Sequence, residues 1–119
     1  MLRAAYRSRS WKGRRRCTRG LVLIPLLESA KGVLNAREIA AASRWIIALT
    51  FGVVNFTRDM GSSLSADGTE LLCAQSRIAL VARACGVLAV DYPCIDIGDR
   101  EELVRQAKGS RSLGFGRSC

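Results

Sequence analysis

Three continuous apolar runs alternate with amphipathic segments along residues 21–119. The runs are residues 21–27, 45–51 and 87–92, and apolar residues fill each run rather than alternating with polar ones. This pattern is typical of strands that are buried on both faces of a parallel sheet. Pro25 interrupts the first run, which is compatible with an irregular position or with the end of a strand.

A helix is predicted after each apolar run. Residues 31–43 and 71–85 both place their apolar side chains along one helical face, and the second segment gives the clearer signal. The last helix is predicted to begin at Asp99, because Glu102 follows at capping-box spacing, and to end near Gly114. Alternating strands and helices predict an α/β fold with parallel strands. A doubly wound sheet and part of a (β/α)₈ barrel both remain open at this point.

Basic charge is concentrated at the start of the chain. The formal net charge is +9, but residues 1–20 hold eight Lys and Arg residues and no acid. We interpret residues 1–20 as a basic, disordered tail and residues 21–119 as the folded domain. Such a tail binds phosphate backbones in a salt-dependent way. It is also Arg- and Ser-rich, as mitochondrial presequences are. We expect a cytoplasmic protein, with mitochondrial targeting left open.

Missing residue types exclude several kinds of site. The chain has no His, which excludes His-based metal sites and Ser/His or Cys/His catalytic pairs. Its five Cys residues form no C-x-x-C pair, so we predict that Cys73 and Cys85 are small buried hydrophobes in a reducing compartment. The longest apolar run is too short to cross a bilayer, and we expect no membrane association.

Polar residues at the ends of the predicted strands mark a candidate site. Glu28 follows the first strand, Asn55 follows the second, and Asp91 closes the third. The carboxyl ends of parallel strands share one edge of the sheet, and ligands bind there in both α/β architectures. Polar loops also begin at strand ends, so position alone does not establish a function.

Five stretches of sequence carry a resemblance to a known family. They are LIPLLESAKGVLNA at 23–36, ALTFG at 48–52, FTRDMG at 56–61, DGTELL at 67–72 and AQSR at 74–77. Together they closely resemble the HpcH/HpaI aldolase and citrate lyase β-subunit family. The resemblance implies a TIM barrel and a Mg²⁺-dependent carbon–carbon lyase, whose substrate is a CoA thioester or a 2-oxo acid.

The resemblance also implies roles for individual residues. Glu28 matches one metal ligand of the family, and Asn55 stands where the family carries a second, acidic ligand. A neutral Asn offers one carbonyl oxygen in place of a carboxylate, so we expect weaker Mg²⁺ binding. Gly52 and Val53 are candidates for binding a substrate carboxylate through backbone N–H groups. The motifs assign no catalytic acid or base.

The chain is too short to form a complete TIM barrel by itself. A TIM barrel takes about 250 residues, whereas this sequence predicts about three βα units, a partial barrel with two open sheet edges. We therefore expect a homo-oligomer, or a partner chain that covers those edges, and impaired activity. The alternative is a non-catalytic α/β interaction module whose basic arm, residues 1–20, binds nucleic acid or an acidic partner.

Overall fold

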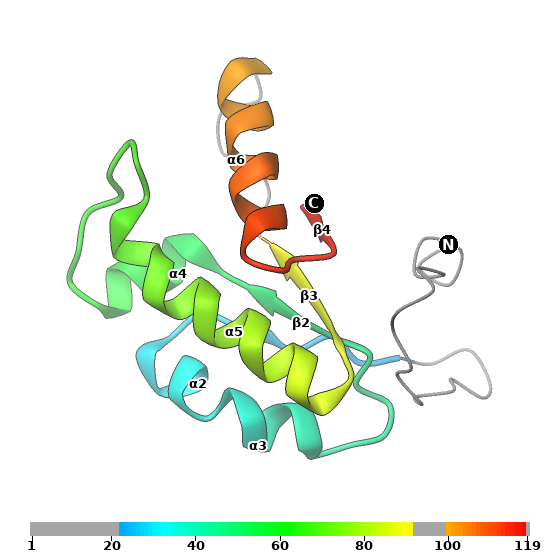
Figure 1. Cartoon of the computed structure of the whole chain (residues 1–119). Coiled ribbons are helices and arrows are strands. Elements are labelled where there is room, and N and C mark those ends of the chain that lie inside the picture. Colours follow the sequence, from blue (N-terminus) through cyan, green and yellow to red (C-terminus); the bar gives the residue numbers. More distant parts are fainter. Residues whose placement is uncertain (1–21, 92–99, 119) are drawn as a thin grey trace.

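In the part of the chain that the structure describes, four parallel strands form one sheet, in which neighbours in space are also neighbours in sequence (Figure 1). The structure is a computed structural model that describes residues 22–91 and 100–118. The strands are β1 (Leu26–Leu27), β2 (Ala48–Phe51), β3 (Leu88–Asp91) and β4 (Arg117–Ser118), in the order β1-β2-β3-β4. The predicted α/β class with parallel strands is confirmed, and a sequential parallel order is that of a section of a (β/α)₈ barrel.

Helices connect successive strands. They are α2 (Ala30–Leu34), α3 (Ala36–Ala41), α4 (Val53–Asp59), the short 3₁₀ helix η1 (Thr69–Leu71), α5 (Leu72–Cys85) and α6 (Arg100–Ser112). Helices α3 and α5 pack together, and α6 extends away from the body of the molecule (Figure 1). The predicted helix 71–85 is confirmed as η1 and α5. Gly86 ends it in the left-handed conformation, with a φ of 67°.

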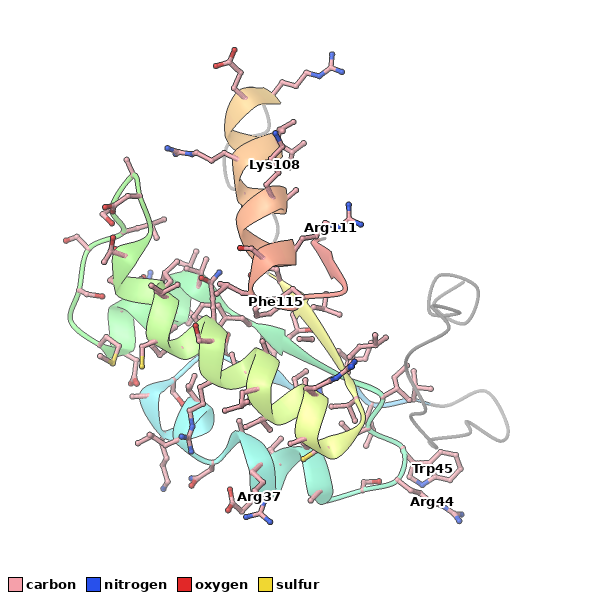
Figure 2. All side chains as sticks on the ribbon, in the orientation of Figure 1. Arg37, Arg44, Trp45, Lys108, Arg111 and Phe115 are labelled. Atoms are coloured by element: carbon pink, nitrogen blue, oxygen red, sulfur yellow. The ribbon has the colours of Figure 1, made fainter. Side chains whose placement is uncertain are left out.

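The core lies between these helices and one face of the sheet. Strands β1 to β3 contribute Leu27, Leu49, Phe51 and Ala89, and helices α2, α3 and α5 contribute Val33, Ala36, Ala40, Ala74, Ile78 and Ala82. Phe115, which follows α6, is also buried against this core (Figure 2). One face of the sheet is therefore covered by helices of this chain.

The predicted helix over residues 31–43 is wrong in one respect, because it breaks at Asn35 into α2 and α3. Arg77 on α5 contacts the backbone at this break. Its guanidinium group donates from Nε to the carbonyl of Val33 at 3.0 Å and from Nη2 to the carbonyl of Leu34 at 2.8 Å. These carbonyls end α2, so a side chain from a distant helix replaces the partners that a continuing helix would supply.

The first apolar run also differs from its prediction. Only Leu26 and Leu27 form strand β1, and an isolated bridge between Leu23 and Ile46 precedes it. Burial on both faces is wrong for this strand: Leu27 is 2% exposed, but Leu26 is 52% and Leu23 44% exposed. Strand β1 lies at the edge of the sheet, and the helices cover one face of it only.

The two cysteines of α5 differ in their exposure. Cys73 is exposed on α5, so its prediction as a buried residue is wrong, whereas Cys85 is half-buried against the core. Predictions on residues 1–20, including the disordered tail and nucleic-acid binding, lie outside the described residues, as does Asp99 as a helix cap. Among the described residues, no helix has the length and apolar character needed to span a membrane.

Candidate functional site

The carboxyl ends of β1 and β2 bring Glu28 and Asn55 into direct contact. Glu28 follows β1 immediately, and Asn55 lies in the first turn of α4, which follows β2. The Asn55 side chain donates from Nδ2 to Oε2 of Glu28 at 2.9 Å. Asn55 is exposed and Glu28 half-buried, so a ligand from solvent reaches both groups. The structure thus places the two predicted metal ligands side by side, although their role as ligands stays a prediction.

Gly52 packs its backbone against the Glu28 side chain. A Cβ atom built at Gly52 would lie 2.8 Å from Cβ of Glu28 and 3.1 Å from its Oε2. Contacts below 3.0 Å force a displacement, so this approach requires a residue without a side chain. Helix α4 begins at the next residue, Val53, and no side chain caps its first turn. The first N–H groups of a helix have no acceptor within the helix, so they are available to an anionic group.

Asp59 contacts the same connection from the end of α4. Its side chain is exposed on the surface of α4. However, Oδ2 of Asp59 accepts a hydrogen bond from the backbone N–H of Ala30 at 2.8 Å. Ala30 begins α2, two residues after Glu28. Sequence reasoning missed this contact, and the only signal for it is the helical spacing of four residues between Asn55 and Asp59.

Asp91 does not belong to this site. It is fully buried, and its Oδ1 accepts from Nε2 of Gln75 on α5 at 3.2 Å. Its Oδ2 accepts from the hydroxyl group of Ser110 on α6. Asp91 does close β3 at the carboxyl edge of the sheet, as the sequence predicted, but its carboxyl group is already hydrogen-bonded within the protein. Its side chain lies on the helix-covered face of the sheet, and it joins β3 to two helices.

The donor set at Glu28 and Asn55 fits Mg²⁺. The ion is typically held by one or two protein side chains, while water and substrate complete an octahedron. Adjacent oxygen ligands of that octahedron are about 2.9 Å apart. Half a turn of the Asn55 amide puts Oδ1 where Nδ2 lies, 2.9 Å from Oε2 of Glu28. No group of three or more His, Cys, Asp or Glu that could hold a metal occurs in residues 22–91 and 100–118. A ligand pair completed by water and substrate is therefore what these residues offer.

A second group of carboxylates lies in the polar loop between α4 and α5. Hydrogen bonds from Ser65 and Thr69 hold the pKa of Asp67 below its usual value. Ser65 lowers the pKa of Glu70 through its hydroxyl group and its backbone N–H, which donates to Oε1 of Glu70 at 2.7 Å. Both carboxylates are thus ionised at neutral pH and already hydrogen-bonded within their own loop.

The strands are parallel and follow one another in sequence order, as in a section of an α/β barrel. At the carboxyl edge of this sheet, an acid and an amide in contact form a candidate cation site. Residues 3–118 match the family described as HpcH/HpaI aldolase/citrate lyase. The chain therefore belongs to the HpcH/HpaI aldolase/citrate lyase family, as its motifs indicated. The match includes most of residues 1–20, whereas the motifs noted in the sequence begin at residue 23.

Individual relatives agree with this assignment. The chain is 38% identical over 93 residues to the citrate lyase subunit beta of Leuconostoc mesenteroides subsp. cremoris, covering 78% of this chain and 31% of that protein. It is 30% identical over 101 residues to the mitochondrial citramalyl-CoA lyase of Rattus norvegicus, covering 78% of this chain and 30% of that protein. The chain thus spans about a third of the length of these curated relatives.

A solved structure shows the same arrangement of elements. The citrate lyase beta subunit from M. tuberculosis, complexed with oxaloacetate and magnesium, superposes with a TM-score of 0.73 and 33% sequence identity. The superposition covers 82% of this chain and 45% of that one. The likeness confirms that the sheet and helices described above have the architecture of this family's barrel.

Proposed function

We propose that this chain supplies the Mg²⁺-binding edge of a carbon–carbon lyase barrel. The observation that carries the proposal is the contact between Asn55 Nδ2 and Glu28 Oε2 at 2.9 Å, at the carboxyl ends of two parallel strands. The relative from M. tuberculosis, which shares this fold, is complexed with magnesium and oxaloacetate. The ligand pair here is one carboxylate and one amide, and it leaves the remaining coordination positions to water and substrate.

Each residue of the proposed site has a separate role in binding the metal or the substrate. Glu28 provides the charged oxygen, and Asn55 provides a neutral carbonyl oxygen once its amide has turned. The backbone N–H of Val53, at the start of α4 where no side chain caps the helix, donates to a substrate carboxylate, and Gly52 leaves room for Glu28 beside it. A bound Mg²⁺ would polarise the substrate carbonyl and stabilise the negative charge that develops as the carbon–carbon bond breaks.

The proposed substrate is a 2-oxo acid or a CoA thioester that yields one. Relatives named citrate lyase subunit beta and citramalyl-CoA lyase, and a neighbour complexed with oxaloacetate, support this class. These compounds carry a carboxylate with an oxygen atom on the adjacent carbon, a carbonyl oxygen in the oxo acid and a hydroxyl oxygen in the thioester. The two kinds of donor at this edge, a metal ligand pair and backbone N–H groups, suit such a substrate.

The proposed active form contains more than the elements described here. Leu26 in β1, and Leu23 and Ile24 just before it, are 41–52% exposed at the edge of the sheet. Exposed apolar strand edges favour pairing with another strand. We propose that further barrel strands cover this edge, either from a second copy or from a partner chain. On its own the chain should show impaired activity, and its Asn55 should bind Mg²⁺ weakly.

The Asn55→Asp variant tests the metal site. A second carboxylate beside Glu28 should raise Mg²⁺ affinity by about tenfold or more, since both ligands are then charged. Isothermal titration calorimetry on the folded chain measures this affinity. Asn35→Asp, which adds the same charge at the exposed junction of α2 and α3, is the matched control and should leave affinity unchanged. Equal Mg²⁺ affinity of the Asn55→Asp variant and the parent would remove this site from consideration.

A further inference from the structure

Helix α4 holds the connection between β1 and α2 at two points. Asn55 donates to the Glu28 side chain at 2.9 Å, and Asp59 accepts from the Ala30 backbone at 2.8 Å. Asn55 and Asp59 are four residues apart on one helix, so they lie one above the other on the same face. Glu28 and Ala30 are two residues apart in the connection that this face meets.

Each end of this contact is anchored independently. Gly52 lies against Glu28 so closely that a Cβ atom would clash with it. At the other end, Ser29 caps α2 by accepting from the N–H of Gly32 at 3.0 Å. The Ala30 N–H is left without an acceptor inside α2, and Asp59 supplies one. A carboxylate at the start of a helix is also favoured by the helix dipole.

We infer that Asp59 is a positioning residue, which fixes the direction of the Glu28 carboxylate toward Asn55. Without the contact to Ala30, the connection after Glu28 loses its only described tie to the end of α4, and Glu28 is free to turn away from Asn55. The consequence for cation binding rests on the function proposed above. The contact itself, and its effect on the Glu28–Asn55 hydrogen bond, do not.

Two substitutions on Asp59 separate position from charge. Asp59→Ala removes the acceptor and the charge, whereas Asp59→Asn removes the charge but keeps an oxygen that accepts from Ala30. We expect Asp59→Ala to weaken Mn²⁺ binding, measured by electron paramagnetic resonance, by about tenfold, which is the usual effect of losing a group that orients a metal ligand. Asp59→Asn should bind Mn²⁺ nearly as the parent does. Glu38→Ala, which removes an exposed acid from α3, is the control for net charge and should change nothing.

Ala30→Pro tests the same contact from the other side. Proline has no N–H and is tolerated at the first position of a helix. Ser29 is extended, with φ −141° and ψ 158°, as the residue before a proline prefers. This variant should therefore fold even if Asp59→Ala does not, and it should weaken Mn²⁺ binding to the same degree.

NMR supplies a readout that needs no metal. Loss of the Asp59 contact should speed hydrogen exchange of the Ala30 amide and shift the Asn55 side-chain NH₂ signal, and Asp59→Asn should restore both. If the Asn55 signal stays at its parent position in Asp59→Ala and Ala30→Pro, the positioning role is overturned. Equal Mn²⁺ loss in Asp59→Ala and Asp59→Asn, with the Ala30 amide still protected in the latter, would overturn it in favour of a charge effect.

The two proposals fail in different ways. If neither the parent nor Asn55→Asp binds Mn²⁺, the proposed metal function fails. The Asn55 signal then decides the role of Asp59 by itself: a shift in Asp59→Ala that Asp59→Asn reverses supports it. An unchanged signal overturns it.

Discussion

Two carboxyl groups stand at the carboxyl ends of β1 and β3, the strands on either side of β2, and have opposite surroundings. Glu28, after β1, is half-buried and takes its hydrogen bond from an exposed amide on α4. Asp91, at the end of β3, is fully buried and takes hydrogen bonds from Gln75 and Ser110. The carboxyl group of Glu28 is therefore accessible to a ligand, whereas that of Asp91 is hydrogen-bonded within the protein.

The difference arises from the alternation of side chains along a strand. Successive side chains point to opposite faces, so a shift of one residue moves a side chain from one face to the other. Leu27 pairs with Phe51 on the helix-covered face, and Glu28 follows one residue later. Asp91 lies on the covered face, where its partners on α5 and α6 reach it. In this fold the face, rather than the strand end, separates a candidate ligand from a structural carboxyl group.

The largest expected effect comes from Asp91→Ala. The substitution leaves the half-buried amide of Gln75 and the buried hydroxyl group of Ser110 without an acceptor, so we expect the free energy of unfolding to fall by about 3 kcal/mol. Glu28→Ala, at the open face, should change it by less than about 1 kcal/mol. Urea denaturation of both variants measures the contrast. Similar losses in the two variants would contradict the distinction between the two faces.

Asp91→Asn sharpens this test. The Asn oxygen still accepts from Ser110, and half a turn of the Gln75 amide lets its oxygen accept from the new NH₂ group. We therefore expect most of the stability lost in Asp91→Ala to be kept, at about 1 kcal/mol below the parent. A loss as large as that of the Ala variant would show that the carboxyl group is required for more than these two hydrogen bonds.

The positions of the strands and helices could be predicted from the sequence better than the burial and hydrogen-bond partners of the polar residues. The strand and helix alternation and the end of α5 at Gly86 follow from local periodicity and glycine chemistry. The break at Asn35 does not, because Arg77, which donates to the two carbonyls before the break, lies 42 residues later in the chain. From position alone, Asp91 and Glu28 could not be told apart, because each stands at the end of an apolar run. A strand boundary uncertain by one residue leaves the face undetermined, and the donors on α5 and α6 are distant in sequence.

Gly52→Ala should have the next largest effect, on the open face. The new Cβ atom would lie 2.8 Å from Cβ of Glu28, which is rigidly tied to the backbone and cannot move aside as a flexible chain end would. We expect a loss of about 2 kcal/mol in the free energy of unfolding, together with weaker Mn²⁺ binding. Urea denaturation and Mn²⁺ titration measure the two effects.

Gly109→Ala is the matched control for this prediction. Gly109 lies in α6, and nothing is within 4 Å of a Cβ atom built there. Alanine is favoured over glycine in a helix, so this variant should gain about 0.5 kcal/mol and keep the parent's Mn²⁺ binding. If both variants were equally stable, the close approach of Gly52 to Glu28 would not be what the site requires.

The smallest expected effect is at Asp67 and Glu70. Like Asp91, both carboxyl groups accept from a hydroxyl group, but they lie in an exposed loop, so they separate the effect of hydrogen bonding from that of burial. Ser65→Ala removes the side-chain hydrogen bonds that lower both pKa values, so both should rise toward their usual values. Thr69→Val removes a hydroxyl that bonds only Asp67, at 2.8 Å, and should raise the pKa of Asp67 alone. NMR titration of the side-chain carboxyl carbons measures both pKa values.

The sign of the accompanying pH effect is fixed by linkage. A carboxyl group whose pKa is lowered in the folded state adds stability above its unfolded pKa, and this stability is lost as pH falls through the lowered value. Ser65→Ala should therefore reduce stability at neutral pH and lose less on acidification than the parent. Because both groups are in contact with water, the difference should be much smaller than that between Asp91→Ala and the parent. Unchanged pKa values in Ser65→Ala would show that hydrogen bonding alone, without burial, does not set the ionisation of carboxyl groups in this protein.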